Sequence, residues 1–477
     1  MSAAPNSSRH FARGADVVAA LALGACAFAL YALSFQHAYW SDGRLLMAWV
    51  DAGVQRHYHV GYLPLAHLFA RVLEPLSGGD VERPLLWLSA SCTALAVAWT
   101  YLAARELGVG ALAAGLCAGA LATAPGTWFY ATCVELHAPH LAVAAAATWW
   151  CARALQRERE GALVPALWFL ALFATHIGGA LWLPALCAVA LRREGRFGWP
   201  RDAWLALVAG LAFLAAWYAW TRELPSGRLF AAQAVMGAVE AWRPAALWTE
   251  WLEPACLLAT LGLAGFVACA TPRWRAFALW LVVPYLAIVP GFAYEERGAY
   301  FAGTWPALAC GVGLALDRAL ASRSVAVRGS TLLLALLALF AQARAARDYV
   351  DAWERDYRGH EWVEPLRREL GNQGCVLVLD AWEREAVRKH SRLDAIALRD
   401  EGRVAQAAGL SVDAVAGMFD LAFGSGGAVA VAASVVDSSE GAALVPALAQ
   451  RYGALREGAH AAYRVVPRPA APPRPGP

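Results

Sequence analysis

The sequence is poor in charge and has almost no lysine. Lys389 is the single lysine among 477 residues, and charged residues make up 16% of the chain. Hydrophobic residues make up 59%, whereas ordinary soluble domains have about 25% charged and about 45–50% apolar residues. The mean hydropathy of +0.43 excludes an ordinary soluble protein and indicates an integral membrane protein. The cations form no stripe with interleaved aromatic residues, so no nucleic-acid partner is expected.

Motifs typical of metalloproteins and nucleotide-binding proteins are missing as well. The sequence contains no CxxC, HExxH, GxGxxG or GxxxxGK[ST] pattern. Most of the ten cysteines lie inside apolar runs, where cysteine behaves as a small apolar residue, so no disulfide framework is expected. No cofactor is therefore expected to be required. A divalent metal bound by Asp42, His57, His59, Glu135 and His137 is a weaker alternative.

Long apolar runs dominate the chain up to residue 345. A membrane-spanning helix needs about 20 apolar residues, so these runs predict an α-helical polytopic membrane protein with about eleven transmembrane helices. The pair between residues 162 and 191 is short for two crossings, which leaves a count of ten open. The expected spans are 17–37, 84–104, 110–128, 138–155, 162–176, 178–191, 203–220, 252–271, 276–292, 301–318 and 329–345.

Arginine residues recur at alternate connections between these apolar runs. Lys and Arg in short loops mark the cytoplasmic side of a membrane protein, so we expect a cytoplasmic N-terminus. The first run continues past Cys26, which favours an uncleaved first span over a signal peptide or a lipoprotein signal. Residues after 346 are expected on the extracytoplasmic side of a bacterial inner membrane. The arginines that carry this argument are Arg9, Arg13, Arg105, Arg153, Arg157, Arg159, Arg192, Arg193, Arg196, Arg201, Arg273, Arg275, Arg318, Arg323 and Arg328.

The C-terminal third differs in kind, because charge rises and long apolar runs stop after Arg347. Buried strands are expected at 375–380 (CVLVLD) and 428–437, followed by a helix at 440–453 and a short last strand in AAYRVVP. Strands that alternate with helices predict a small α/β domain. The expected organisation is a transmembrane domain at 1–345, an extracytoplasmic α/β domain at 346–467 and a disordered Pro-rich tail at 468–477.

Four groups of ionisable residues fall on the expected extracytoplasmic side, beside the ends of apolar runs. Ionisable residues at membrane depth are costly, which makes them candidates for a functional site. Their convergence on one side indicates a shared site. The groups are Asp42, Arg44, Arg56, His57 and His59 in the first loop, Glu135, His137 and His140 at the start of the fourth run, His176 between two short runs, and Glu295, Glu296, Arg297 and Tyr300 late in the transmembrane region.

Each group also has a purely structural interpretation. Asp42 is suited to cap a helix over residues 43–54, because Asp is a favoured residue at that position. Arg297 is suited to pair with Glu295 or Glu296. The histidines are suited to form hydrogen bonds with neighbouring helices. The sequence leaves these alternatives open.

The first loop resembles the first external loop of GT-C superfamily membrane glycosyltransferases, especially bacterial relatives of the protein O-mannosyltransferases. In that family an acidic residue follows the first span, and a Gly-Val…His-Pro-Pro-Gly-Tyr-Pro-Leu segment comes after it. Asp42 holds the acidic place, and residues 53–65 (GVQRHYHVGYLPL) hold the rest. The sequence departs from the family at Arg44 and Leu45, where a second acidic residue is usual, and at residues 57–59 (HYH), which replace His-Pro-Pro.

Three later segments carry the same resemblance, which covers most of residues 15–320. Glu135-Leu-His137 is similar to a Glu-Val-Tyr-x-Leu-His motif of the family. The segment around His176 (THIGGALWLP) is similar to the family's short histidine-containing hairpin. Residues 296–306 (ERGAYFAGTWP) are similar to a late Arg-Tyr-x-x-Pro segment that leads into a span.

The resemblance implies an inverting glycosyltransferase that moves a sugar from a polyprenyl-phosphate donor to an extracytoplasmic hydroxyl of a protein, lipid or glycan. In this interpretation Asp42 is the general base, Glu135 is catalytic beside it, and Arg297 stabilises the donor phosphate. A transporter or flippase of lipid-linked sugars is an alternative, although the sequence shows no inverted repeats or interrupted helices. A non-catalytic membrane scaffold is another. The residues expected to bind substrate are Arg44, Arg56, His57, His59, Tyr62, His137, His176, Arg297 and Tyr300.

Overall fold

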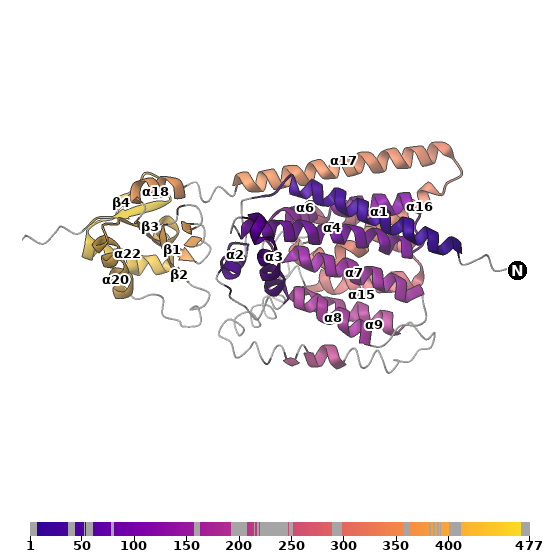
Figure 1. The fold of residues 1–477 in the computed structure, drawn as a ribbon, viewed down its shortest axis with the longest axis horizontal. Coiled ribbons are helices and arrows are strands. Elements are labelled where there is room, and N and C mark those ends of the chain that lie inside the picture. The colour runs from indigo at the N-terminus through magenta and orange to yellow at the C-terminus, as the bar shows by residue number, and fades with distance from the viewer. Residues whose placement is uncertain are drawn as a thin grey trace, which may run out of the picture. The chain divides into compact units, whose positions relative to one another are not determined.

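The computed structural model divides the chain into two compact units (Figure 1). The larger unit contains most of residues 1–354, and the smaller consists mainly of residues 355–477. The structure describes residues 7–36, 43–51, 53, 61–77, 81–156, 163–191, 251–288, 298–356, 362–371 and 412–468, with parts of 208–247 and 373–399.

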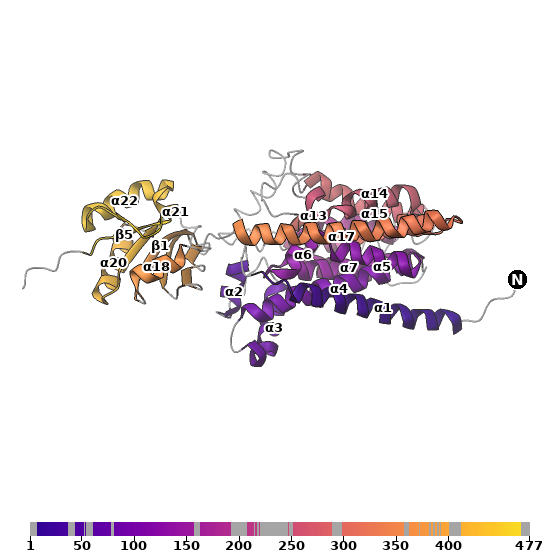
Figure 2. The same ribbon diagram turned by 90° about the horizontal axis from the view of Figure 1, so that it is seen from above.

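The larger unit is built from helices that run along one another (Figures 1 and 2). Among the described residues, four helical stretches are each long and apolar enough to cross a membrane: Gly14–Ala32, Glu82–Glu106, Ala299–Leu320 and Val325–Asp351. The bent pair Ala111–Ala122 and Pro125–Thr132 adds a fifth if it is counted as one span. The expected count of about eleven spans stays a prediction, because the other apolar segments are shorter or lie partly outside the described residues.

The structure gives bounds for these helices before residue 357: α1 (Ser7–Ala32), α2 (Gly43–Asp51), α3 (Tyr62–Ser77), α4 (Glu82–Glu106), α5 (Ala111–Ala122), α6 (Pro125–Thr132), α7 (His137–Gln156), α8 (Leu163–Thr175), η2 (Ile177–Trp182), α9 (Leu183–Leu191), α13 (Glu253–Ala255), α14 (Leu257–Cys269), α15 (Pro272–Ile288), η6 (Ala299–Thr304), α16 (Trp305–Leu320) and α17 (Val325–Asp356). The two elements labelled η are 3-10 helices.

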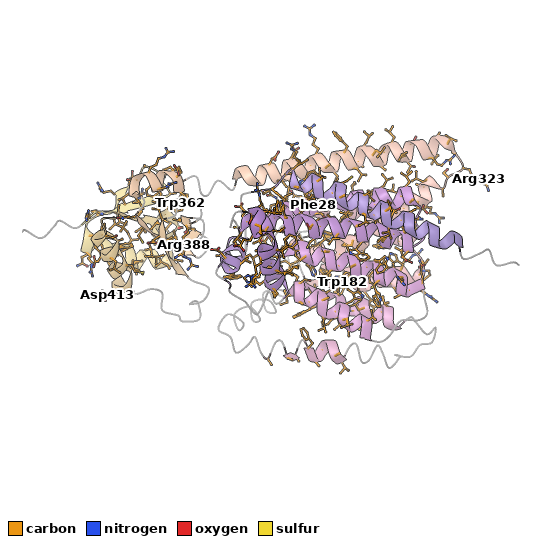
Figure 3. The ribbon with its side chains drawn as sticks, in the orientation of Figure 1. Phe28, Trp182, Arg323, Trp362, Arg388 and Asp413 are labelled. Carbon is orange, nitrogen blue, oxygen red and sulfur yellow. The ribbon has the colours of Figure 1, made fainter. Side chains whose placement is uncertain are left out.

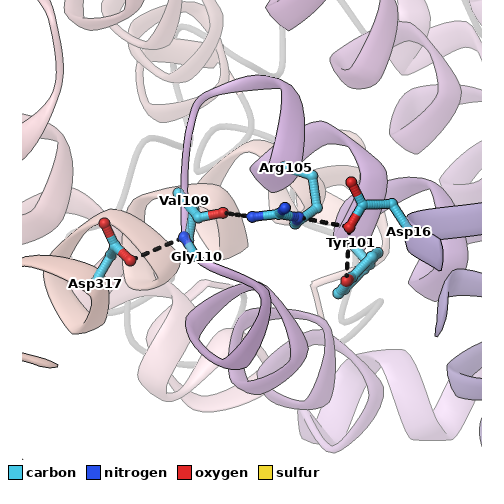
Figure 4. Close-up of polar contacts among 6 residues, drawn as sticks. All are labelled: Asp16, Tyr101, Arg105, Val109, Gly110 and Asp317. Carbon is cyan, nitrogen blue, oxygen red and sulfur yellow. Dashed lines mark hydrogen bonds and ion pairs between the residues drawn. The ribbon is translucent and has the colours of Figure 1, made fainter. Parts of the chain in front are cut away.

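One end of the helical unit, which we name the basic end, is held together by polar contacts of Asp16, Arg105 and Asp317 (Figure 4). Arg105 Nε, in the last turn of α4, donates to Asp16 Oδ1 at 2.8 Å, and Tyr101 Oη donates to the same oxygen at 3.3 Å. The Gly110 N–H donates to Asp317 Oδ1 at 2.8 Å. Because unpaired charges are costly in an apolar bundle, these contacts fix the ends of α1, α4, α5 and α16 to one another.

The opposite end, the histidine end, carries His137, His176 and Tyr300. Helix α7 joins the two ends, since it begins at His137 and its last residue, Gln156, donates to the backbone carbonyl of Glu106 at the end of α4. The 20 residues of α7 correspond to about 30 Å, which is about the thickness of the hydrocarbon core of a bilayer. The length of a membrane-spanning helix therefore separates the two ends.

Helices break at the histidine end instead of running through it. Helices α5 and α6 bend by 62° relative to each other. Pro125 takes the first position of α6, where its missing N–H leaves no hydrogen bond unmade. Helix α8 gives way to η2, and η6 precedes α16. Short segments and their backbone groups, rather than continuous helix faces, therefore surround this end.

Glycines allow α14 and α16 to pack backbone against backbone. A Cβ atom on Gly265 would lie 1.9 Å from Gly311 O, and one on Gly311 would lie 2.2 Å from Gly262 O. Small residues are common at contacts between membrane helices, because lipid tails provide no hydrophobic drive for association and van der Waals contact must supply it. This packing fixes α16 and, through it, the adjoining η6.

The smaller unit contains a five-stranded sheet in the order β2-β1-β3-β5-β4. Strand β1 pairs parallel with β2 and β3, whereas β5 pairs antiparallel with β3 and β4. Val376 and Val378 of β1 belong to one core with α18, and Cys375 and Leu377 belong to a second core with α20 and α22, as the alternation of a strand requires. Trp362 belongs to the first core (Figure 3). The elements are α18 (Val363–Leu370), β1 (Cys375–Asp380), β2 (Asp394–Arg399), α20 (Val412–Gly424), β3 (Val429–Ala432), α21 (Ala433–Val436), α22 (Ser439–Tyr452), β4 (Arg456–Glu457) and β5 (Tyr463–Val466).

The structure corrects two details of the strands expected from sequence. The predicted strand at 428–437 is too long, because the chain turns into α21 at Ala433 so that Val435 joins the core beside α22. Strand β2 was not predicted. Two of its core residues, Ala395 and Ala397, are small, and alanine is depleted in strands, so the segment gives little strand signal.

Replacing Gly311 by alanine is expected to destabilise the helical unit by about 1–3 kcal/mol, since the new Cβ atom would overlap a backbone carbonyl that no rotamer change can move. The measurement is the midpoint of thermal unfolding of the detergent-solubilised protein. Gly115 of α5 has open space at its Cβ position, so Gly115→Ala should leave the midpoint nearly unchanged. Equal midpoints for the two variants would contradict the backbone-to-backbone packing.

Candidate active site

Five aromatic and imidazole rings form one cluster at the histidine end. The ring centroid of His176 lies 4.9 Å from that of His137 and 5.1 Å from that of His140. The ring of Tyr300 lies 5.2 Å from His176, and that of Tyr130 lies 4.7 Å from His137. All three histidines are buried. Residues that are far apart in sequence therefore form a single site, which we name the histidine cluster.

The backbone holds His176 in place where α8 gives way to η2. Its Nδ1 accepts a hydrogen bond from the Gly178 N–H at 2.9 Å, so the side chain caps η2. A Cβ atom on Gly179 would lie 2.4 Å from the backbone of Leu172, so this turn requires glycine. Because Nδ1 accepts, the proton of the neutral ring is assigned to Nε2, which can donate to a neighbouring group.

His140 joins the cluster to the elements packed against it. Its Nδ1 lies 3.1 Å from Thr175 Oγ1, and the Thr175 hydroxyl donates to backbone carbonyls of α8. The hydroxyl therefore accepts from His140 Nδ1. A Cβ atom on Gly303 would meet Tyr285 Oη at 2.5 Å, His140 Nε2 at 3.0 Å and Trp182 Nε1 at 3.1 Å. Glycine at 303 thus lets η6 approach these three polar side chains. Figure 3 labels one of them, Trp182, inside the helical unit.

Glu135 adds a buried carboxylate to this region. Its Oε2 accepts from the Leu136 N–H at 3.1 Å and lies 4.0 Å from His137 Nε2. Burial, and after it the charge of Glu135, raises the pKa of the Tyr62 phenol at the start of α3. A carboxylate, an imidazole and a phenol therefore share one buried neighbourhood, which can exchange hydrogen bonds with a hydroxylated ligand.

The chain enters and leaves the first loop beside the histidine cluster. The Gln36 N–H donates to Thr132 O at 2.8 Å, at the end of α6. The Gly61 N–H donates to Ala174 O at 2.8 Å, near the end of α8. A Cβ atom on Gly61 would also lie 2.8 Å from that carbonyl, so glycine allows the contact. Both ends of the first loop are thus fixed to the elements that carry the cluster.

The structure brings together part of the site expected from sequence. Arg44 belongs to α2, and its side chain is not described. The expected residues in one region of the helical unit are Tyr62, Glu135, His137, His176 and Tyr300. Asp42, Arg56, His57, His59 and Arg297 lie outside the described residues, so their roles stay predictions.

Sequence reasoning missed several side chains that hold the cluster. Tyr130, Thr175 and Tyr285 each contact a histidine or the elements that carry one. A lone tyrosine or threonine inside an apolar run has no spacing that marks it. Only its position near the end of such a run, where polar groups are cheaper, could have suggested a role.

No metal site is found in the part of the chain that the structure describes, where no three His, Cys, Asp or Glu side chains are arranged to hold an ion. The metal alternative also involved Asp42, His57 and His59, which lie outside the described residues. The expectation that no metal is required therefore stays a prediction.

Comparison with known proteins finds likeness in structure only, because no protein-family model and no curated protein matches the sequence. ArnT from Cupriavidus metallidurans bound to undecaprenyl phosphate is similar with a TM-score of 0.60 and 15% sequence identity, over 94% of this chain and 97% of ArnT. The chain has the GT-C fold. The apo state of the same ArnT gives a TM-score of 0.57 at 15% identity, over 95% of this chain and 98% of ArnT.

The likeness to ArnT covers nearly the whole of both chains. The oligosaccharyltransferase of Archaeoglobus fulgidus is also similar, at 14% identity over 79% of this chain and 62% of that protein, but its TM-score of 0.47 is too low to carry an argument. These structures are of ArnT and an oligosaccharyltransferase, so the likeness to protein O-mannosyltransferases stays a prediction. At such identities the likeness shows the fold and not the activity.

The capping role of His176 can be separated from its ring contacts by two substitutions. His176→Asn keeps a side-chain acceptor for the Gly178 N–H, whereas His176→Ala removes it. We expect the alanine variant to be less stable than the asparagine variant by about 1 kcal/mol, the usual cost of losing a cap. Thermal unfolding in detergent measures the difference. Equal midpoints would show that the cap does not hold the turn.

Proposed function

We propose that this protein is an inverting glycosyltransferase, which moves a sugar from a polyprenyl-phosphate donor to an extracytoplasmic hydroxyl group. The observation that carries the proposal is the histidine cluster with Glu135, buried at the end of the GT-C fold opposite the basic end. ArnT, which shares this fold, is bound to undecaprenyl phosphate in its structure, and the same class of lipid carrier suits this chain. The cluster would contact the sugar and the phosphate of such a carrier.

The position of the cluster suits a lipid-linked donor. Arginines occupy the connections that the positive-inside rule assigns to the cytoplasm, and Arg105 lies at the basic end. The histidine end would then face the outside, where nucleotide sugars are absent and sugars are carried on lipid phosphates. A site at the edge of the bilayer can take the head group of such a donor while its prenyl tail remains in the membrane.

Arg297 is the proposed partner of the donor phosphate. It precedes Tyr300 of the histidine cluster by three residues, which span at most about 11 Å of extended chain. A guanidinium is always charged and presents paired N–H donors that fit phosphate oxygens. It would stabilise the negative charge that remains on the phosphate when the bond to the sugar breaks.

Asp42 is the proposed general base. It follows the buried Gln36 by six residues of chain, which span at most about 22 Å. The acceptor oxygen would attack the anomeric carbon and lose its proton to the carboxylate. The bond from that carbon to the phosphate oxygen would break, and the polyprenyl phosphate would leave with the electron pair. A single displacement inverts the anomeric centre. Glu135 and His137 would orient Asp42 or the sugar hydroxyls.

Replacing Asp42 by asparagine is expected to lower transfer by at least about 100-fold, because an amide cannot take the proton. The assay follows labelled sugar from undecaprenyl phosphate to envelope glycoconjugates in membranes. Asp51→Asn is the matched control, since Asp51 is an exposed carboxylate of α2 in the same loop. Wild-type turnover in Asp42→Asn would contradict the assignment of Asp42 as the general base. Sugar that crosses the membrane without product would indicate a flippase, and neither outcome in the wild type would indicate a scaffold.

Replacing Arg297 by alanine is expected to weaken the binding of undecaprenyl phosphate by about 10- to 100-fold, since a charged hydrogen bond is worth about 1.5–3 kcal/mol. Arg297→Lys should recover only part of the loss, because an ammonium group cannot bind two oxygens in a fixed fork. Arg71→Ala removes an exposed cation of α3 and is the control. Equal affinities for Arg297→Ala and Arg71→Ala, measured with detergent-solubilised protein, would contradict the role.

A further inference from the structure

Gln36 is a fully buried amide at the point where the chain leaves α1. Its exposed fraction is 0%, and it makes three hydrogen bonds to α6. The backbone N–H donates to Thr132 O at 2.8 Å, and Nε2 donates to Thr132 Oγ1 at 2.6 Å and to Phe129 O at 3.1 Å. Two of these three hydrogen bonds come from the side chain, so Gln36 does more than pair its own backbone N–H as the chain leaves α1.

The neighbours of Gln36 fix the orientation of its amide. The Thr132 hydroxyl donates to Trp128 O at 2.8 Å, so its lone pair must accept from the amide. Phe129 O is a carbonyl and can only accept. Both partners therefore require the NH₂ group of Gln36, and the flipped amide would face two acceptors with an oxygen. Only the orientation with Nε2 toward α6 gives both acceptors a donor.

The segment that Gln36 holds leads directly to the candidate site. Thr132 is the last residue of α6, Glu135 follows three residues later, and α7 begins at His137. Residues 133–136 thus form the whole connection between the two helices. Gln36 fixes the start of this connection, and the ring contact between His137 and Tyr130 fixes its finish.

We propose that Gln36 is a positioning residue that acts through Glu135. It would hold the 133–136 connection so that the Glu135 carboxylate keeps its place beside His137. This role rests on the proposed function for its kinetic consequence and on the hydrogen bonds of Gln36 for its structural one. Gln36 itself would touch neither donor nor acceptor.

The kinetic test is a double-mutant cycle between Gln36 and Glu135. Gln36→Leu keeps a similar volume and removes the amide, and we expect it to lower kcat by about 10- to 100-fold, as small misplacements of catalytic groups do. In a Glu135→Gln background the same change should lower kcat less than about twofold, because residues that act as a unit are not additive. Full additivity would overturn the proposal.

Tyr31→Phe is the matched control for this cycle. Tyr31 lies at the end of α1, five residues before Gln36, is equally buried, and donates one side-chain hydrogen bond to Ala122 O at 2.9 Å. The effect of Tyr31→Phe on kcat should be additive with that of Glu135→Gln. Thr132→Ser should behave like the wild type, since it keeps the hydroxyl, whereas Thr132→Val should show part of the loss of kcat seen in Gln36→Leu, because the Gln36 amide keeps its hydrogen bond to Phe129 O. If Thr132→Ser and Thr132→Val had the same kcat, the result would also contradict the positioning role of Gln36.

Hydrogen exchange tests the inference without any assay of transfer. In the detergent-solubilised protein, Gln36→Leu should accelerate amide exchange in residues 133–137 by at least about tenfold, while Tyr31→Phe leaves that segment unchanged. Unchanged exchange in Gln36→Leu would overturn the positioning role even in an active protein. If the wild type transfers no sugar, but Gln36→Leu accelerates exchange in residues 133–137 as expected, the proposed function is wrong and the positioning role still holds.

Discussion

The cost of burying polar groups without partners determines how the helical unit is arranged. A charge in an apolar bundle requires a partner, and among the described residues of the unit Arg105 and Asp16 meet at one end and Glu135 and His137 at the other. At the basic end Arg105 and Asp16 neutralise each other at 2.8 Å. At the histidine end the Glu135 carboxylate lies 4.0 Å from His137 of the histidine cluster. Between them, helices such as α5 (ALAAGLCAGALA) consist of small apolar residues and carry no charge.

Breaks in the helices at the histidine end expose backbone groups that hold side chains in place, which continuous helices could not do. A continuous helix uses all its backbone groups internally and offers only side chains. Where α8 gives way to η2, a backbone N–H is free to hold the His176 ring. At η6, Gly303 brings the backbone against Tyr285 and His140. Side chains held in this way lose little freedom when a ligand binds, which is the condition for electrostatic preorganisation.

The sequence predicts the location of the site better than its construction. Charge asymmetry and costly polar residues lead to Glu135, His137, His176 and Tyr300, and the structure brings these together. Gln36 could not be predicted, because a single amide at the end of an apolar run carries no periodicity or motif. The packing of Gly311 against α14 was also hidden, since helix-helix register is set by contacts between segments about 50 residues apart. In the smaller unit, alternating valines marked β1, but the alanines of β2 did not mark that strand.

The geometry around Glu135 favours a division of labour between two acids. Its Oε2 already accepts a hydrogen bond from the Leu136 N–H and faces His137, and the side chain is buried. A carboxylate that is engaged in this way is suited to hold a neighbour in place, and less suited to take a proton from an attacking hydroxyl. This geometry is in keeping with a mechanism in which a second acid is the general base. The proposed mechanism gives that step to Asp42 and leaves Glu135 to hold the sugar or the base in place.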